Sequence, residues 1–342
     1  MIKQFISKVV KGENLTEAEM EKAMTEIMIG TATPAQIGGF LIGLRMKGET
    51  VTEIAAAATV MRELASGVDI GGLDHAVDIV GTGGDASGTF NVSTASMFVA
   101  AAAGCHVAKH GNRSVSSKSG SADALESAGL RLDLSPEQVG RCVREVGVGF
   151  MFAPGHHSAM KHAIGPRREM GVRTVFNVLG PLTNPAGVPN QLLGVFSDEL
   201  LEPLAEVLRK LGSRHVMVVH SRDGLDEISA AAPTRVVEAR GSDIREYDFT
   251  PEDAGLQRVS LDGLEVRGAE ESLELIRAAL SGETGDRAER ARAVVALNAG
   301  AALYVAGLQP GVKEGVAEAM ALMQSGAPWA KVEALAELTS KM

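Results

Sequence analysis

A glycine-rich segment that ends in an aspartate is the first stretch of the sequence suited to binding an anion. Residues 78–85 read Asp-Ile-Val-Gly-Thr-Gly-Gly-Asp, so an apolar run leads into three closely spaced glycines. Without side chains, these glycines let the backbone approach a phosphate and direct N–H groups at its oxygens. Residues 91–94, Asn-Val-Ser-Thr, follow at an expected helix start, where free N–H groups also favour phosphate. The pattern predicts a phosphate loop, with an ordinary glycine turn as the alternative.

A second polar segment extends from Lys109 to Asp123, directly after another strand-like run. Its cations, hydroxyls and glycines are the groups that a polyanion such as pyrophosphate uses. Because the carboxyl ends of parallel strands meet at one edge of a sheet, we expect this segment and residues 78–94 to form one site. A solvated loop is the alternative, and Ser121 could serve only as the cap of the next helix.

A basic segment and an acidic pair complete the candidate chemistry. The basic residues lie between 156 and 173, an unusual density in an acidic protein, and favour an anionic ligand: His156, His157, Lys161, His162, Arg167, Arg168 and Arg173. Taken singly, each is more often a surface or ion-pair residue. Asp226 and Glu227 follow a strand-like run, and adjacent carboxylates there are ligands of the kind that Mg²⁺ takes beside substrate phosphates.

The elements that must position these residues fall into two groups. Capping patterns predict helices in the first seventy residues, one beginning at Pro34 and another after Thr50 that stops at Gly67. Strand-like runs then alternate with helical ones, which predicts a mainly parallel α/β sheet. The expected strands are 76–80, 106–110, 148–152, 192–196 and 215–220. We therefore expect a helical domain over 1–72, with a returning segment at about 162–180, and an α/β domain over 73–342.

Composition excludes several classes of function. The 342 residues carry 33 Lys and Arg against 43 Asp and Glu, a formal net charge of −10, which argues against nucleic-acid binding. The longest apolar run, 97–103, is far shorter than the roughly 20 residues that span a bilayer. Cys105 and Cys142 have no metal-type spacing, and no secretory leader precedes them. We expect a cytoplasmic protein without membrane or nucleic-acid partners.

Together these segments resemble the anthranilate phosphoribosyltransferases over nearly the whole chain. The motifs that carry the resemblance occur in the same order, at residues 81–85, 91–94, 109–113, 120–123, 173–185 and 223–227. The resemblance implies anthranilate and phosphoribosyl pyrophosphate (PRPP) as substrates, Mg²⁺ as cofactor, and the nucleoside phosphorylase/phosphoribosyltransferase class of fold. It also implies a homodimer built on the helical domain.

Carried over by position, the resemblance implies a role for individual residues. Those matching PRPP positions are Gly81, Gly84, Asp85, Thr89, Asn91, Ser93, Thr94, Lys109, Ser117 and Ser121. Ser93, Asp226 and Glu227 match magnesium positions, and Gly81, Asn112 and Arg167 match anthranilate positions. His110, His156 and His157 line the expected anthranilate path. The same segments contain Val92, Gly111 and Arg113, which complete the candidate substrate-binding set.

The resemblance has two departures, and two other functions stay open. Ala86 stands where the family has a glycine, and Ser158 where it has a proline, which affects the phosphate loop and the anthranilate path respectively. A pyrimidine nucleoside phosphorylase would share the fold and the glycine loop. A non-catalytic nucleic-acid-binding relative would need a surplus of basic residues. In the expected reaction Lys109 and Mg²⁺ stabilise the leaving pyrophosphate and Arg167 orients anthranilate, with no evident general base.

Overall fold

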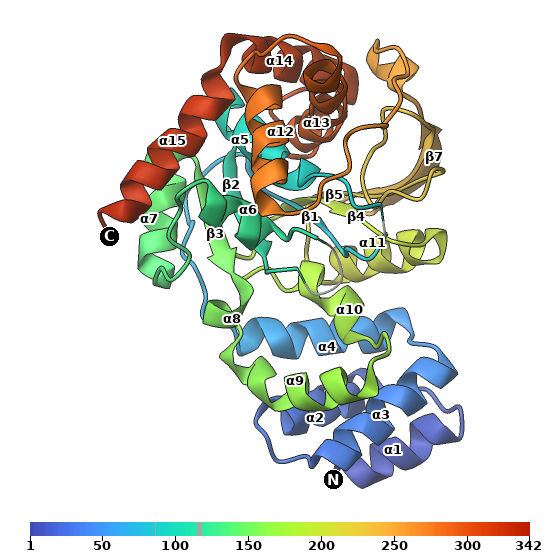
Figure 1. Ribbon diagram of the computed structural model, residues 1–342. Helices are drawn as coiled ribbons and strands as arrows, with labels where there is room; N and C mark the ends of the chain where they lie inside the picture. Colours follow the sequence, from blue (N-terminus) through green and yellow to red (C-terminus); the bar gives the residue numbers. More distant parts are fainter. Residues whose placement is uncertain (86, 115–117) are drawn as a thin grey trace.

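The chain folds into a helical part at one end and a sheet covered by helices at the other (Figure 1). The computed structural model describes residues 1–85, 87–114 and 118–342. The helical part contains α1 (Ile2–Val10), α2 (Glu17–Met28), α3 (Pro34–Lys47), α4 (Val51–Glu63) and α9 (Lys161–Met170). The last of these returns from the middle of the sequence to pack on α2 and α3. The boundary expected at residues 72 and 73 stays a prediction.

Local capping explains where the first helices begin. The hydroxyl of Thr33 accepts a hydrogen bond from the backbone N–H of Gln36, and Pro34 is the first residue of α3, as predicted. Thr50 and Glu53 form the predicted capping box of α4. The expected stop at Gly67 is wrong, because α4 ends at Glu63 and Gly67 has no positive φ. Gly67 instead lies close to the main-chain oxygen of Pro185.

Within the described residues, seven strands form one sheet in the order β3-β2-β1-β4-β5-β6-β7. Its strands are β1 (Ala76–Gly81), β2 (His106–Gly111), β3 (Val148–Phe152), β4 (Asn190–Gly194), β5 (His215–Ser221), β6 (Thr234–Arg240) and β7 (Asp243–Phe249). The first five are parallel, and β6 and β7 are antiparallel additions at one edge. The strand order reverses between β1 and β4, and such a switch point is where open α/β sheets bind ligands.

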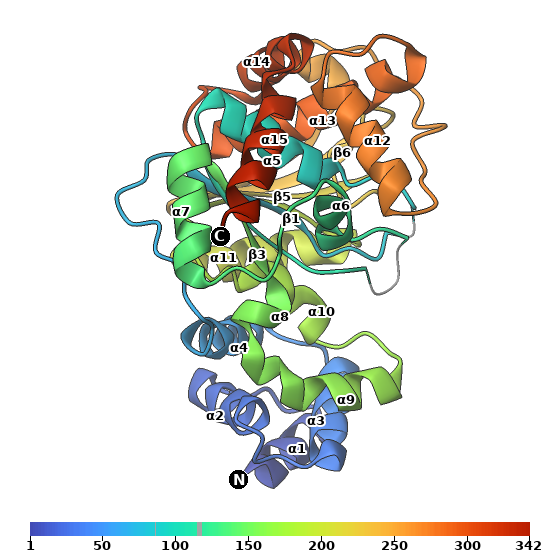
Figure 2. The ribbon, with the colours of Figure 1, turned by 60° about the vertical axis from the view of Figure 1, so that its left-hand side comes forward.

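Helices cover the sheet on two faces (Figure 2). The remaining helices are α5 (Val92–Ala103), α6 (Ser121–Ser127), α7 (Pro136–Val146), α8 (Ala153–His156), α10 (Phe176–Leu179), α11 (Leu201–Lys210), α12 (Ala269–Leu280), α13 (Asp286–Val305), α14 (Val312–Ser325) and α15 (Ala327–Ser340). Short 3-10 turns are η1 (Ser158–Met160), η2 (Gly180–Leu182), η3 (Asp198–Leu200) and η4 (Pro251–Ala254). None of the helices in the described part of the chain is long and apolar enough to cross a membrane.

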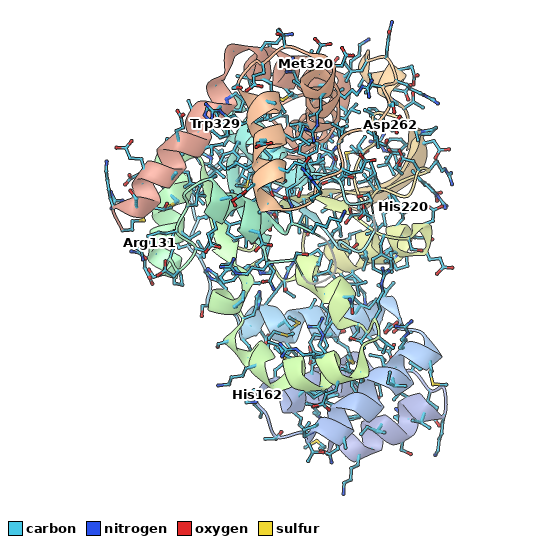
Figure 3. All side chains as sticks on the ribbon, viewed as in Figure 1. Arg131, His162, His220, Asp262, Met320 and Trp329 are labelled. Atoms are coloured by element: carbon cyan, nitrogen blue, oxygen red, sulfur yellow. The ribbon has the colours of Figure 1, made fainter. Side chains whose placement is uncertain are left out.

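Two large apolar clusters, one on each face, hold these layers together. One contains α5, α12 and α13 with side chains of β1, β2 and β5, such as Ile79, Val107 and Met217. The other runs from the helical part through α10 and α11 to the opposite face of β4 and β5. Side chains fill the space within both parts (Figure 3). Because the second cluster is shared, the helical part packs on the sheet through apolar contacts as well as being linked to it.

The mainly parallel α/β fold is confirmed, with two differences in the strands. β4 begins and ends two residues before the expected 192–196. The strands β6 and β7 were not predicted. β7 carries acidic and basic side chains on an exposed edge, so it lacks the apolar run of a buried strand. β6 pairs antiparallel with β5, and β7 pairs antiparallel with β6, so this end of the sheet is not parallel.

A buried carboxylate fastens β6 to its neighbours. Glu238 is 2% exposed and accepts hydrogen bonds from His215 Nε2 at 2.9 Å, Tyr247 Oη at 2.8 Å and Tyr304 Oη at 2.7 Å. Burial alone would raise the pKa of Glu238, but these hydrogen bonds outweigh it and leave the pKa at about 2. The charged form of Glu238 therefore stabilises the junction of β5, β6, β7 and α13.

Replacing Glu238 should give a pH-dependent loss of stability. Because the pKa of Glu238 is lowered from an ordinary 4.5 to about 2, its stabilisation is present above pH 4.5 and lost as pH falls towards 2. Glu238→Gln should lower the free energy of unfolding by roughly 3 kcal/mol at pH 7 and by about 1 kcal/mol less at pH 4. Urea unfolding at both pH values measures the difference, with exposed Glu246→Gln as control. If the difference in free energy of unfolding between wild type and Glu238→Gln is the same at both pH values, the role of the Glu238 charge is contradicted.

Candidate active site

The segment that carries Asp226 packs directly on the carboxyl ends of β1 and β4. A Cβ atom added to Gly194 would overlap the main-chain oxygen of Asp226, and one added to Gly81 would lie 2.6 Å from Asp226 Oδ2. The same Oδ2 accepts a hydrogen bond from the N–H of Gly83 at 2.7 Å. Only glycine permits this approach, so the acidic segment lies over the switch point of the sheet and against the predicted phosphate loop.

The acidic pair also reaches the start of α5. Glu227 Oε1 accepts a hydrogen bond from the N–H of Ser93 at 3.0 Å, and so acts as a cap for this helix. Lys109 Nζ lies 3.3 Å from Ser93 Oγ and also donates to the main-chain oxygen of Ile79. The phosphate loop, the start of α5, Lys109 and the acidic pair therefore converge on one site, as the sequence predicts for these segments. Lys109 is only 2% exposed, more enclosed than expected for a cation at a strand end.

The electrostatics of this cluster are unfavourable for the two carboxylates of the acidic pair and for one buried ammonium group. Burial, together with the charge of Asp85, raises the pKa of Asp226 to about 7. Burial and the charge of Asp226 raise the pKa of Glu227 well above its ordinary value. Burial likewise lowers the pKa of Lys109, against the attraction of Asp78 and Glu227. The carboxylates of Asp226 and Glu227 are short of compensating positive charge, which a bound cation would supply.

Asp78 and Asn184 belong to the same region but were not among the expected site residues. The Asn184 amide donates to Asp78 Oδ2 at 2.7 Å and to the main-chain oxygen of Ala108 at 2.8 Å, which ties residue 184 to β1 and β2. Asp78 Oδ1 has no hydrogen-bond partner within the described residues. Burial raises the pKa of Asp78 to about 6. Because Asp78 lies in an otherwise mostly apolar strand, the sequence pattern did not indicate that its side chain belongs to the site.

The phosphate-loop residues take up different environments. Arg173 Nη2 donates to the main-chain oxygen of Gly84 at 2.8 Å, and Asp85 Oδ1 accepts from the N–H of Ser87 at 3.3 Å. Thr89 Oγ1 donates to Ser87 Oγ at 2.8 Å. On α5, Val92 is buried in the core, and Thr94 Oγ1 is buried with no partner among the described residues.

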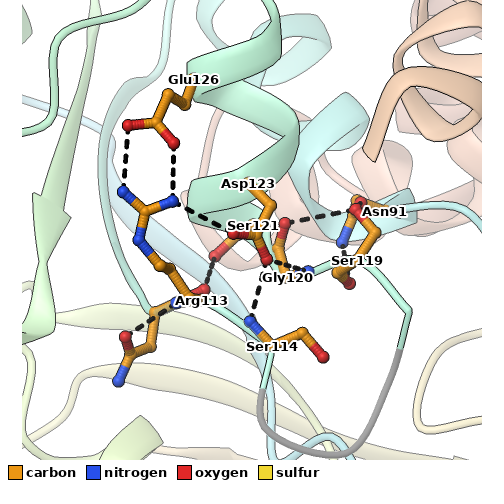
Figure 4. A network of polar contacts seen from close by, with 9 residues as sticks. Asn91, Arg113, Ser114, Ser119, Gly120, Ser121, Asp123 and Glu126 are labelled. Atoms are coloured by element: carbon orange, nitrogen blue, oxygen red, sulfur yellow. Dashed lines mark hydrogen bonds and ion pairs between the residues drawn. The ribbon is translucent and has the colours of Figure 1, made fainter. Parts of the chain in front are cut away.

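Figure 4 shows how the second polar loop is closed. Asp123 Oδ2 accepts from the N–H groups of Ser114 at 3.0 Å and Gly120 at 2.9 Å, which pins the two ends of the loop together. Arg113 is turned outward to form exposed ion pairs with Asp123 and Glu126, so the structure does not bring its charge into the site. Gly120 caps α6, so Ser121 is not the cap.

The residues around this loop also show where small side chains are needed. Ser121 is the first residue of α6, and its Oγ lies 3.4 Å from the main-chain oxygen of Asn112. The side chain of Asn112 is exposed and accepts from the N–H of Arg113 at 2.7 Å. A Cβ on Gly111 would overlap Ser121 Oγ, so glycine lets the loop approach α6. Ser117 lies outside the described residues.

Two of the expected histidines face each other on the side of β2 opposite Lys109. The ring centroids of His110 and His157 are 5.0 Å apart, and both Nε2 atoms are buried without a partner in the described part of the chain. Burial, with each neighbouring histidine, lowers the pKa of His110 to about 3 and of His157 to about 4. Both rings are neutral at pH 7. His156 instead binds the main-chain oxygen of Ser66 at 2.9 Å.

The basic segment does not gather at one point. The Arg167 guanidinium lies 5.0 Å from the centroid of the Phe176 ring and makes no hydrogen bond or ion pair with any other described residue. Arg173 stacks at 3.9 Å from the Phe196 centroid beside the phosphate loop. His162 lies on the helical part, away from the sheet (Figure 3). Arg167 and Arg173 therefore contact different aromatic rings, one in α10 and the other beside the phosphate loop.

Comparison with known proteins decides the family. A family model for the a/b domain of a glycosyl transferase family matches residues 73–329, and one for its helical bundle domain matches residues 3–65. The anthranilate phosphoribosyltransferase of Hahella chejuensis is 61% identical over 99% of this chain and 98% of that protein. The chain belongs to the anthranilate phosphoribosyltransferase family. The enzyme of Cellvibrio japonicus is 60% identical over 99% of this chain and 98% of its own length.

Solved structures of the anthranilate phosphoribosyltransferase family share the fold. The crystal structure of the Thermus thermophilus enzyme has a TM-score of 0.91 at 44% identity, covering 98% of this chain and 99% of that one. The Saccharomyces cerevisiae enzyme in complex with PRPP and Mg has a TM-score of 0.89 at 26% identity, covering 100% and 98%. Of the two departures from the family pattern, Ala86 lies outside the described residues, and Ser158 is exposed at the start of η1.

Among alanine substitutions of the glycines in the sheet, Gly194→Ala should lower the activity of this enzyme most. The new Cβ would collide with the main-chain oxygen of Asp226, so the acidic segment must move. We expect kcat/KM to fall on the order of 100-fold and stability by about 1 to 3 kcal/mol. Gly268→Ala is the control, because a Cβ there meets no atom within 4 Å. Wild-type kcat/KM for Gly194→Ala would show that the contact is unimportant.

Proposed function

We propose residue roles in the reaction that this enzyme catalyses. It transfers the 5-phosphoribosyl group of PRPP to the amine of anthranilate, giving N-(5-phosphoribosyl)anthranilate and pyrophosphate in tryptophan biosynthesis. The observation that carries the assignment of roles is the convergence of the two polar loops and the buried acidic pair at the switch point of the sheet. This arrangement supplies N–H groups, hydroxyls and carboxylates around a single volume.

PRPP is held by the phosphate loop, the start of α5 and the second polar loop. Backbone N–H groups around Gly84 and at the first turn of α5 suit phosphate oxygens, and the helix dipole favours their charge. The remaining proposed contacts come from side chains at these segments: Asp85, Thr89, Asn91, Ser93, Thr94, Lys109, Ser117 and Ser121. Gly81 and Gly111 contribute through their small size, because a side chain there would collide with Asp226 and Ser121 respectively. Val92 contributes by packing in the core at the start of α5.

Mg²⁺ is the cofactor, and the chemistry of the donor set fits it. Asp226 and Glu227 are hard-oxygen donors whose pKa values are raised by burial and then by neighbouring carboxylates. Glu227 accepts a hydrogen bond from the N–H of Ser93, and a cation here would stabilise the charged form of both acids. The described residues contain no group of three or more His, Cys, Asp or Glu side chains suited to one metal ion. Mg²⁺ commonly completes such partial sites with water and substrate phosphates. When bound, it neutralises negative charge on the pyrophosphate group.

Lys109 acts beside the leaving pyrophosphate. Its ammonium group donates to Ser93 Oγ and to the main-chain oxygen of Ile79, which leaves one of its three N–H groups for the substrate. Fixed in this way, the cation needs no rearrangement as negative charge develops on the departing oxygen. Its charge also balances Asp78 and Glu227, so Lys109 stabilises these buried carboxylates as well as the leaving group.

Anthranilate is bound by Arg167, Asn112 and the two facing histidines. Burial lowers the pKa of the Arg167 guanidinium without a carboxylate partner, so the group is ready to pair with the carboxylate of the substrate. The neutral rings of His110 and His157 offer polar edges along the path without adding a competing cation. With pKa values of about 3 and 4 they are weak bases at neutral pH, so the amine proton leaves after bond formation, to water or to pyrophosphate.

The enzyme also acts, we propose, as a cytoplasmic homodimer built on its helical part. Val10 is 69% exposed at the end of α1, and Met46 is 83% exposed at the end of α3. These helices pack on each other, so the two apolar side chains belong to one region of the helical part. Burying such side chains against a second copy would stabilise a dimer.

A fluorescence assay tests the proposed activity directly. The fluorescence of anthranilate should decrease when the enzyme, PRPP and Mg²⁺ are all present, and should stay constant when EDTA replaces Mg²⁺. A parallel assay of uridine with phosphate tests the nucleoside phosphorylase alternative, which shares the fold. Turnover of uridine without turnover of anthranilate would overturn the proposed function.

Replacing Arg167 should weaken the use of one substrate selectively. Arg167→Ala removes a charged hydrogen bond worth about 1.5 to 3 kcal/mol, so the KM for anthranilate should rise by roughly tenfold to a hundredfold. The KM for PRPP should change little. Arg168→Ala is the matched control, because Arg168 is an exposed neighbour on α9. Equal increases in both KM values would remove Arg167 from the anthranilate site.

A further inference from the structure

Three segments distant in sequence meet at the side chain of Asn91. Asn91 precedes α5 but does not cap it with its side chain. Its Oδ1 accepts hydrogen bonds from Ser119 Oγ and from Ser272 Oγ, each at 2.7 Å. Its Nδ2 donates to the main-chain oxygen of Ser119 at 3.1 Å, a contact that Figure 4 shows. The start of α5, the second polar loop and α12 are thereby joined at one residue.

The hydrogen-bonding capacity of Asn91 is almost completely used. A carboxamide oxygen has two lone pairs, and here both accept from hydroxyl groups. The nitrogen has two N–H groups, and one donates to residue 119. The amide orientation is therefore determined, and Asn91 can offer one N–H to a ligand but no acceptor. A donor of this kind suits an oxygen of PRPP.

Ser272 is the member of this group that holds Asn91 from inside the core. It is 0% exposed, on α12, which is anchored by the buried side chains of Leu275 and Ile276. The Ser272 hydroxyl donates to Asn91 Oδ1 and accepts from the backbone N–H of Asn91 at 3.0 Å. Both the side chain and the backbone of Asn91 are thus bound to one rigid hydroxyl, 181 residues away in sequence.

We propose that Ser272 is a positioning residue for PRPP, acting only through Asn91. Loss of its hydroxyl removes one of the two donors to Asn91 Oδ1 and the partner of the Asn91 backbone N–H. Only Ser119 then holds the carboxamide, which is less firmly oriented, and the first turn of α5 loses a fixed point. The substrate then meets a donor that must be ordered on binding, which weakens affinity. This inference rests on the proposed function, and on Asn91 contacting PRPP.

The first test separates the two substrates. Ser272→Ala should raise the KM for PRPP about five- to tenfold, the effect of losing a hydrogen bond or two, and leave kcat and the KM for anthranilate within about twofold of wild type. Ser96→Ala is the matched control: Ser96 is also a fully buried helical serine, but its hydroxyl contacts only main-chain oxygens of Val92 and Val295. Its KM values should be unchanged. Equal effects of the two variants would overturn the proposal.

A double-mutant cycle on the KM for PRPP distinguishes a residue that acts through Asn91 from one that only stabilises the fold. If Ser272 acts through Asn91, the KM for PRPP of the variant with both Asn91→Ala and Ser272→Ala should equal that of Asn91→Ala alone. Additive effects on KM would overturn the proposal. Should Ser272→Ala fail to fold, Ser272→Cys decides instead, because a thiol fills the site but is a weak donor. It should show the raised KM for PRPP, and a wild-type KM would count against the proposal.

The same measurements distinguish failure of this inference from failure of the proposed function. Wild-type protein assayed in parallel must consume anthranilate when PRPP and Mg²⁺ are present. If it does not, the proposed function is wrong whatever the variants do. If it does, while Ser272→Ala keeps the wild-type KM for PRPP, the inference alone is wrong.

Discussion

The close approach of Asp226 to the glycines that end β1 and β4, through its side chain at Gly81 and its backbone at Gly194, is the constraint on which the site depends. A parallel sheet brings its strand ends to one edge, but side chains there would keep the acidic segment several ångströms away. Gly81 and Gly194 remove that obstacle, and Asp226 and Glu227 reach Gly83 and the start of α5. The phosphate loop, the helix terminus and the acidic pair then act as one unit.

The same packing makes the charge distribution of the site unfavourable for its carboxylates. The charge of Asp85 acts on both Asp226 and Glu227, which are buried, and Lys109 on β2 attracts the same two carboxylates electrostatically. Burial and neighbouring carboxylates raise the pKa values of Asp226 and Glu227, which indicates a shortage of positive charge at this edge of the sheet. A site of this kind gains most when a cation arrives together with phosphate groups, because the cation relieves the carboxylates and the N–H groups of α5 compensate the phosphates. Substrate and metal binding are thus expected to reinforce each other.

Much of this arrangement follows from sequence pattern, because strand ends in a parallel sheet converge whatever the details of packing. Capping patterns made the helix starts at Pro34 and Val51 predictable, and the alternation of runs made the five parallel strands predictable. The convergence of strand ends predicted that the phosphate loop, the start of α5, Lys109 and the acidic pair would meet. Other features depend on long-range contacts that local pattern does not encode. Glu227 caps α5 and Ser272 holds Asn91 across 134 and 181 residues respectively. Arg113, which local composition placed in the site, pairs instead with Glu126.

Anomalous scattering from crystals grown with PRPP and Mn²⁺ in place of Mg²⁺ tests the central claim most directly, because it locates the metal independently of activity. The account predicts an anomalous peak coordinated by the carboxylates of Asp226 and Glu227 and by pyrophosphate oxygens. A nearby cavity of about 120 Å³, lined by Ser87, Thr89, Asp223 and Glu265, offers an alternative acidic environment. A peak bound there, with Asp226 and Glu227 uncoordinated, would contradict the account.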